Sequence, residues 1–218
     1  MRDRARDAIL PLRIRIGVTG LMASGKSSVA RRFEEHGAVR VDGDALGWET
    51  LRVSGVRDRI LEAFGSGVIG ADGAVDRASL GGIVFSDPAA MERLNAIVQP
   101  SLRELVVRRL GEAFAGSAGP RVVVLDAALL TTWRLEPELD GVVEVTAPER
   151  LRMERLKVAR GFTAEEALLR VRGQRLPPVR DAKRLWRIQN EADPAALLAR
   201  ADEVWRAIEA LAAAAPNP

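Results

Sequence analysis

The chain has 218 residues, 47% of them hydrophobic, which is enough for one domain of ordinary size with a substantial core. It contains no cysteine, no tyrosine and a single histidine, His36. This composition excludes a disulfide framework, a thiolate zinc site, an iron–sulfur cluster and any mechanism that needs two histidines. Acid–base chemistry must come from aspartate, glutamate, lysine or His36. His36 stands near the end of a predicted helix, where the helix dipole stabilises a cation, so we interpret it as a helix-end residue.

The charge is basic but evenly spread. There are 33 lysines and arginines against 30 acids, which gives a net charge of +3 and a pI of about 10.1. Only three of the bases are lysines, and the arginines alternate with acids at helical spacing instead of forming blocks. We interpret the high pI as a preference for arginine, and we expect no nucleic-acid partner.

The first twelve residues predict a loose N-terminal extension. They carry charges of both signs, and their apolar stretch, 8–12, is too short for the core of a signal peptide. No apolar run approaches the roughly 20 residues that a membrane-spanning helix needs. We therefore expect a cytoplasmic protein without a membrane partner, either a monomer or a small homo-oligomer.

Strands and helices alternate along the rest of the chain. Runs of β-branched residues predict strands, and amphipathic stretches bounded by capping residues predict helices. Pro100 should kink or split the helix that contains it. In chain order we expect a strand over 13–19, a helix over 25–36, a strand over 38–42, helices over 44–52, 57–64, 76–85 and 87 to near 116, strands over 121–126 and 141–146, helices over 148–160 and 163–174, a strand over 185–189 and a helix over 193–211.

This order of elements predicts the fold class. The run RVVVLD at 121–126 is almost continuously β-branched, which is typical of a strand buried on both faces of a parallel sheet. Alternating strands and helices then predict an α/β doubly wound sheet, in a single domain over 13–211. Because the segment from about 45 to 116 contains helices only, we interpret it as an inserted helical lobe. Residues 212–218 are expected to be a disordered tail.

A phosphate-binding loop is the strongest motif. Gly20 to Ser27, GLMASGKS, matches the pattern G-x-x-x-x-G-K-[ST] between a predicted strand and a predicted helix. Glycines let main-chain N–H groups curl around phosphates, and the helix N-terminus adds its positive dipole. Lys26 can reach the β- and γ-phosphates, and the Ser27 hydroxyl can bind Mg²⁺. The motif therefore predicts nucleoside triphosphate binding.

Three features favour a small-molecule kinase among phosphate-loop proteins. Ala127 follows the strand-end Asp126, where hydrolytic ATPases commonly have a glutamate, and the guanine-reading pattern N-K-x-D is absent. Asp42 and Asp44 lie at the carboxyl end of a predicted strand, where ligands bind in open α/β sheets. One such carboxylate can orient or deprotonate an acceptor hydroxyl. The alternative is that they cap the following helix.

Together these motifs resemble those of the dephospho-coenzyme A kinases over about 14–193. The resemblance implies a three-layer P-loop kinase fold with a five-stranded parallel sheet, a substrate lobe over about 45–116 and a lid over about 150–175. It implies transfer of the γ-phosphoryl group of ATP, with Mg²⁺, to the ribose 3′-hydroxyl of 3′-dephospho-coenzyme A, the final step of coenzyme A biosynthesis. The matching segments are IGVTGLMASGKSSVARRFEEHGAVRVDGDAL and the stretches 63–65, 71–73, 75–80, 84–88, 94–100, 124–130, 148–155, 162–174 and 190.

The resemblance also implies roles for individual residues. Asp44 corresponds to the catalytic carboxylate, while Lys26 and the lid residue Arg155 would neutralise charge in the transition state. Asp42 would orient Asp44 or belong to the metal shell. The residues expected to hold ATP are Gly20, Ala23, Ser24, Gly25, Lys26, Ser27, Ser28 and Asn190. Those expected at the acceptor are Thr19, Asp42, Asp44, Arg77 and Leu130.

The chain departs from the family pattern mainly on the acceptor side. Gln99 stands where the family has histidine, Thr131 and Thr132 stand where it has phenylalanine and glutamate, and Ala159 replaces a lid arginine beside Arg160. Two alternatives follow. One is a related kinase with a different acceptor, such as a nucleoside, a nucleotide or a sugar acid. The other is a nucleotide-gated RNA- or protein-binding module that has lost catalysis.

Overall fold

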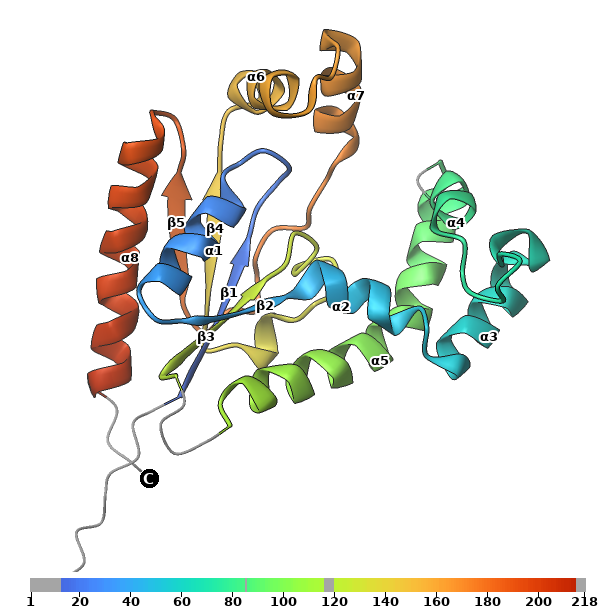
Figure 1. The fold of residues 1–218 in the computed structure, drawn as a ribbon, viewed down its shortest axis with the longest axis horizontal. Coiled ribbons are helices and arrows are strands. Elements are labelled where there is room, and N and C mark those ends of the chain that lie inside the picture. The colour runs from blue at the N-terminus through green and yellow to red at the C-terminus, as the bar shows by residue number, and fades with distance from the viewer. Residues whose placement is uncertain (1–12, 85, 116–119, 215–218) are drawn as a thin grey trace, which may run out of the picture.

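The computed structural model describes residues 13–84, 86–115 and 120–214, and it shows a β-sheet with helices on both faces (Figure 1). The strands of the described chain are ordered β2-β3-β1-β4-β5, and every neighbouring pair is parallel. The predicted α/β fold with a five-stranded parallel sheet is therefore confirmed. The five strands are β1 (Ile14–Thr19), β2 (Val39–Asp42), β3 (Val122–Asp126), β4 (Gly141–Thr146) and β5 (Leu185–Gln189). Each strand begins and ends within one residue of its predicted bounds.

Helices connect the strands and cover the sheet. They are α1 (Lys26–Glu35), α2 (Gly43–Thr50), α3 (Ser54–Phe64), α4 (Arg77–Val84), α5 (Pro88–Ala113), α6 (Glu149–Arg160), α7 (Ala164–Gly173) and α8 (Pro194–Ala214), with short 3₁₀ turns η1 (Ser66–Val68) and η2 (Glu136–Glu138). None of the helices in the described part is long and apolar enough to cross a bilayer. The predicted extension, 1–12, and the end of the predicted tail, 215–218, lie outside the described residues. The start of that tail, 212–214, is helical, because α8 continues beyond its predicted end.

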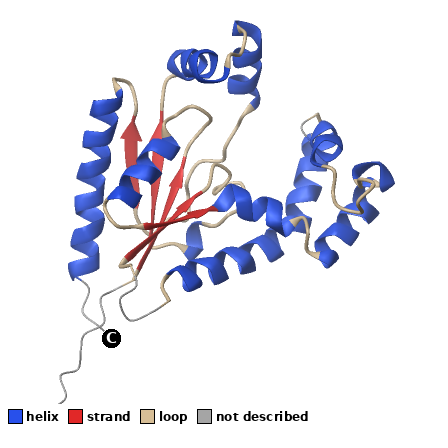
Figure 2. Ribbon diagram, in the orientation of Figure 1, coloured by secondary structure: helices blue, strands red, loops and turns tan. Residues whose placement is uncertain are grey.

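The core lies on both sides of the sheet, because alternate side chains of a strand point to opposite faces. Ile16 of β1 and Val124 of β3 belong to the cluster that includes Phe33 of α1 and Trp205 of α8. Leu125, the next residue of β3, belongs to the second cluster, formed with α2, α3, α4 and α5. Figure 2 shows the resulting three layers, with the strands between the two groups of helices.

Polar contacts fasten α1 to α8 at the edge of the first cluster. Arg32 donates hydrogen bonds from Nε and Nη2 to the two carboxylate oxygens of Asp202, at 2.6 and 2.9 Å. His36, the C-cap residue of α1, places Nε2 2.7 Å from Asp202 Oδ1 and stacks on Trp205. Arg32 and His36 hold the pKa of Asp202 well below its ordinary value. His36 is therefore a helix-end residue, as predicted.

Helix α5 runs continuously through Pro100, so of the two outcomes expected at this proline, a kink or a split, the structure shows the kink (Figure 1). The helix begins at a capping residue, Asp87, whose Oδ1 accepts a hydrogen bond from the N–H of Ala89 at 2.8 Å. Figure 1 shows that α5 bends along its length, as a proline inside a helix requires. The bend allows α5 to contact α3 and α4 as well as the sheet.

Two groups of helices stand away from the sheet (Figure 1). Helices α3 and α4 pack with the start of α5 in the segment predicted as a substrate lobe. Helices α6 and α7 stand beyond the carboxyl ends of the strands, and Thr163 and Glu166 form a capping box at the start of α7. Their apolar contact is formed by Leu156, Ala167 and Val171. The roles of these groups as a substrate lobe and a lid stay predictions.

Candidate active site

The phosphate-binding loop joins β1 to α1, as its sequence pattern predicts. Gly25 is the N-cap of α1 and has a φ of 101°, a left-handed conformation that glycine adopts without strain. A Cβ at Gly20 would lie only 2.3 Å from the carbonyl oxygen of Val145, so a side chain there would collide with β4. The first N–H groups of a helix have no partner within the helix. The loop and the first turn of α1 therefore offer main-chain donors to phosphate oxygens.

Side chains from distant segments fix this loop in place. Asn190, which follows β5, donates from Nδ2 to the carbonyl oxygen of Ser24 at 2.7 Å. Arg155 of α6 donates to Asn190 Oδ1 at 2.9 Å and to the carbonyl oxygen of Ala23 at 3.2 Å. Gln174, after α7, accepts a hydrogen bond from the N–H of Met22. The structure thus brings Asn190, predicted to bind ATP, and Arg155, predicted as a catalytic lid residue, against the loop.

Lys26 lies between two carboxylates at the ends of neighbouring strands. Its Nζ forms an ion pair with Asp126, the last residue of β3, and lies 3.7 Å from Oδ2 of Asp44. Arg40 of β2 donates from Nη1 to the other oxygen of Asp126 at 3.1 Å. Because Asp126 is only 5% exposed, its charge needs both cationic partners. The ammonium group of Lys26 is therefore held at the carboxyl edge of the sheet, next to the phosphate loop.

Asp44 combines partial burial with access to solvent. Its Oδ1 accepts a hydrogen bond from the N–H of Ala128 at 3.2 Å, and its side chain is 44% exposed. Burial, helped by the negative charges of Asp126 and Asp42, raises the pKa of Asp44 above its ordinary value, against the opposing effects of Lys26 and the Ala128 N–H. A carboxylate with a raised pKa is a better proton acceptor than an ordinary aspartate. Asp44 thus has the chemistry that a general base requires, and its catalytic role stays a prediction.

Asp42 and Thr19 are bonded within the protein. Asp42 is the N-cap of α2, where its Oδ1 accepts from the N–H of Ala45 at 2.9 Å. The capping interpretation is confirmed for Asp42, and its role as an orienting or metal-shell group stays a prediction. The buried Thr19 donates from its hydroxyl to the carbonyl oxygen of Ala128 at 3.2 Å. Both residues thus border the segment that holds Asp44.

Two residues predicted at the acceptor lie in different settings, one in the core and one beside α2. Leu130 is 0% exposed and belongs to the core, where its Cδ1 would lie 2.4 Å from a Cβ at Gly17. Its side chain therefore offers no surface to a substrate, which corrects the prediction for this residue. Arg77 stands on α4, in the helical segment, with its guanidinium carbon 4.3 Å from the centre of the Trp48 ring. Arg77 therefore contacts α2, the helix that carries Asp44, and its role at the acceptor stays a prediction.

The donor set around Ser27 suits a nucleotide-bound Mg²⁺. Ser27 and Ser28 are exposed in the first turn of α1, and Ser24 is buried with no hydrogen-bond partner for its Oγ among the described residues. No cluster of three or more histidine, cysteine or acidic residues in the described part could hold a metal ion. Mg²⁺ commonly binds through few protein ligands together with substrate phosphates and water. Ser27 would therefore share the ion with phosphate oxygens.

Sequence reasoning missed three residues that shape the site. The sequence identifies Asp126 only as the end of a buried strand, although an acid at that position meets the phosphate loop when β3 lies beside β1. Arg40 lies in a strand of alternating polar and apolar residues, and Gln174 lies at the end of a helix. Neither position indicates a role at the site. Only their contacts with Asp126 and Met22, more than 80 residues away in the chain, reveal their roles.

We expect Asn190→Ala to weaken ATP binding about tenfold, because it removes two hydrogen bonds that together fix the loop and Arg155. Asn190→Asp keeps an acceptor for Arg155 but loses the donor to Ser24, so it separates the two contacts. Calorimetric titration of both variants with ATP measures the effect. Unchanged affinity in Asn190→Ala would contradict the positioning role.

Comparisons with known proteins agree with this geometry. The family model described as dephospho-CoA kinase matches residues 14–195. The dephospho-CoA kinase of Thermobifida fusca is 36% identical over 197 residues, covering 90% of this chain and 96% of the relative. That of Geobacter sulfurreducens is 37% identical over 191 residues, covering 87% and 96%. A crystal structure of a Thermus thermophilus protein matches with a TM-score of 0.70 at 30% identity, covering 90% of this chain and 98% of that one.

Proposed function

Because the chain belongs to the dephospho-CoA kinase family, we propose that it transfers the γ-phosphoryl group of ATP to the ribose 3′-hydroxyl of 3′-dephospho-CoA. One observation carries the proposal: the Asp44 carboxylate lies 3.7 Å from the Lys26 ammonium group, beside the phosphate loop. A hydroxyl placed at Asp44 would face a γ-phosphate held by Lys26. This is the pairing of base and charge that phosphoryl transfer to an alcohol needs.

In the proposed reaction, the acceptor hydroxyl gives its proton to Asp44 while its oxygen bonds to the γ-phosphorus. The bond between that phosphorus and the β–γ bridging oxygen breaks, and ADP leaves with the electron pair of that bond. Lys26 and Arg155 would stabilise the charge that develops on the phosphoryl oxygens. Mg²⁺, held through Ser27 and the phosphates, would supply further charge neutralisation. The proton then passes from Asp44 to solvent, which restores the carboxylate.

One departure on the acceptor side, Gln99, has a partner within the protein. Gln99 donates from Nε2 to the carbonyl oxygen of Thr132 at 2.9 Å, so two of the changed positions bond to each other. This contact joins α5 to the loop that follows β3. Packing within the protein therefore explains Gln99, whereas the acceptor at position 132 is a main-chain carbonyl and nothing in the structure explains the threonine there.

The proposed function is tested by coupled detection of ADP release from ATP, Mg²⁺ and 3′-dephospho-CoA, with Lys26→Ala as the control. Turnover that requires the acceptor and is lost in the control supports the proposal. A panel of nucleosides, nucleotides and sugar acids serves as the comparison. Turnover with one of these and none with 3′-dephospho-CoA would overturn the acceptor. ATP and RNA binding without any transfer would favour the non-catalytic module.

Trp48 offers a flat surface on the proposed acceptor side. It is 45% exposed, carries Arg77 on one side, and stands four residues after Asp44, hence on the same face of α2. Four residues of a helix span about 6 Å, so an adenine attached to a ribose at Asp44 would be within reach of the ring.

We therefore expect Trp48→Ala to raise the KM for 3′-dephospho-CoA roughly 5- to 100-fold, the range of a lost base–aromatic stack. The KM for ATP should change less than about twofold, and Trp48→Phe should recover most of the loss. Steady-state kinetics with each substrate varied in turn measures both constants. A fall in kcat alone would refute stacking at this residue.

A further inference from the structure

A buried arginine in α6 has two side-chain nitrogens without a hydrogen-bond partner in the described protein. Arg152 is 6% exposed, and its Nε and Nη1 atoms are buried without a hydrogen-bond partner among the described residues. Burial lowers the pKa of its guanidinium, and Glu149 opposes this only partly. Glu149 itself pairs with Arg172, at 3.0 Å. Leaving a buried charge unpaired is costly, so Arg152 lowers the stability of the isolated fold.

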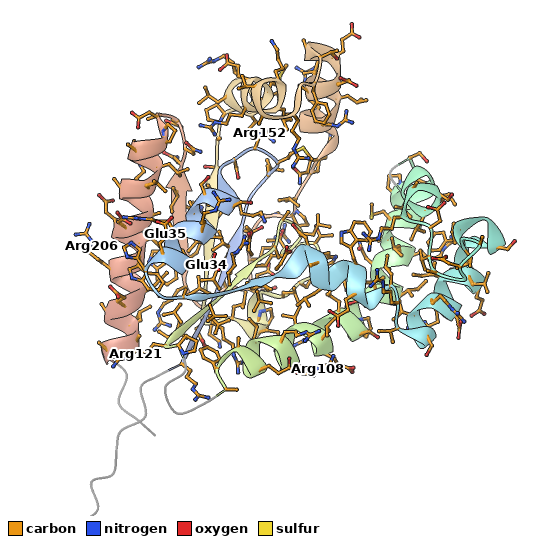
Figure 3. The ribbon with its side chains drawn as sticks, viewed as in Figure 1. Glu34, Glu35, Arg108, Arg121, Arg152 and Arg206 are labelled. Carbon is orange, nitrogen blue, oxygen red and sulfur yellow. The ribbon has the colours of Figure 1, made fainter. Side chains whose placement is uncertain are left out.

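The position of Arg152 points toward the nucleotide site. It stands three residues before Arg155, on the same face of α6, and Arg155 donates to the carbonyl oxygen of Ala23. Met22 and Ala23 of the phosphate loop pack against the apolar cluster of α6 and α7. Figure 3 shows Arg152 beneath α6, on the side of the helix that faces the loop after β1. A ligand bound on this loop would therefore lie beneath the same helix face.

We propose that Arg152 binds a phosphate group of a substrate in the assembled active site. The inference rests on the proposed function. A guanidinium group donates in a fixed planar fork that suits phosphate oxygens, and these bonds are strong because both groups are charged. The phosphate belongs either to the chain of ATP or to the pyrophosphate of dephospho-CoA. In either case the phosphate oxygens accept the hydrogen bonds that Arg152 does not make within the protein. This explains why α6 buries a charged residue where an apolar one would fit.

The test uses Arg152→Met, which keeps the length of the side chain and removes the charge. Without ligands we expect its melting temperature to rise, because the unpaired buried charge is gone. Its affinity for one of the two substrates should fall roughly 10- to 100-fold, the effect of losing a charge-assisted hydrogen bond. Arg152→Lys should recover part of that affinity. Arg150→Met is the matched control, because Arg150 lies on the same helix, is 75% exposed and pairs with Glu154.

Equilibrium titration with a non-hydrolysable ATP analogue and, separately, with dephospho-CoA tells the two sources of phosphate apart. Weaker binding of the analogue assigns Arg152 to ATP, and weaker binding of dephospho-CoA assigns it to the acceptor. Unchanged affinity for both would overturn the proposal. So would a joint fall of melting temperature and affinity, which indicates a structural role. Since binding needs no turnover, failure of the proposed function appears separately, as absent transfer in the unaltered protein.

Discussion

Asp44→Asn should reduce phosphoryl transfer by roughly 10²- to 10⁴-fold, the usual contribution of a general base, while ATP binding remains. The amide keeps an oxygen for the N–H of Ala128, at 3.2 Å in the native protein, so the local backbone should not move. It cannot accept a proton from an acceptor hydroxyl. Lys26 retains its ion pair with Asp126, and this preserves the side of the site that faces the phosphates.

Single-turnover transfer from ATP, measured beside calorimetric ATP titration, checks this result. Asp58→Asn is the matched control, because Asp58 is an exposed acid on α3 that pairs only with its neighbour Arg57 among the described residues. The pH profile adds a second readout. Because burial raises the pKa of Asp44, kcat/KM should fall on the acid side at a pH above the ordinary aspartate value of about 4. Wild-type transfer rates in Asp44→Asn would exclude this residue as the base.

The same pKa shift predicts the sign of a stability change. A carboxyl whose pKa is raised in the folded state stabilises the fold most at low pH, and this contribution is lost as the pH rises through the folded pKa. At neutral pH the ionised Asp44 is therefore a cost to the fold. Asp44→Asn should accordingly melt at a higher temperature than the native protein at pH 7, with a smaller difference at pH 4.

The elements of the sheet could be predicted because their signals are local. β3 is an almost continuous run of β-branched residues. Gly20 and Gly25 belong to the phosphate-loop pattern, and both have positive φ angles that favour glycine. The site was harder, because its contacts join residues far apart in sequence. Leu130 stands next to a loop and could face a ligand or the core; only the packing against Gly17 decides this. Asp126 likewise becomes a site residue only when β3 lies between β1 and β2.

The burial of Arg152 could not be predicted from the sequence either. Its sequence neighbourhood is a helix with four arginines, of which Arg150 and Arg160 are exposed. No periodicity distinguishes one of them as buried. Only the folded structure distinguishes Arg152, which is buried with its Nε and Nη1 atoms lacking a hydrogen-bond partner among the described residues.

Lys26→Met should have the second large effect, a loss of roughly 10²- to 10³-fold in kcat together with weaker ATP binding. The ammonium group is the cation that the structure places nearest to both Asp44 and Asp126, so its removal takes away charge stabilisation where the phosphoryl group would pass. The same change leaves Asp126 with Arg40 as its ion-pair partner, at 3.1 Å, in a setting where the carboxylate is almost fully buried. Unfolding should therefore become easier by about 1–3 kcal/mol, the cost of a buried polar group that loses a partner.

The double variant Lys26→Met with Asp126→Asn separates these two effects. Neutralising Asp126 removes the buried charge that Lys26 balanced, so the double variant should regain most of the stability lost in Lys26→Met. It should not regain transfer activity, because the missing cation acts on the substrate and not only on the fold. Chemical denaturation and ADP-release kinetics on the single and double variants, with the exposed Lys183→Met as control, measure both quantities. If activity returns together with stability, Lys26 holds the fold and another group carries the charge stabilisation.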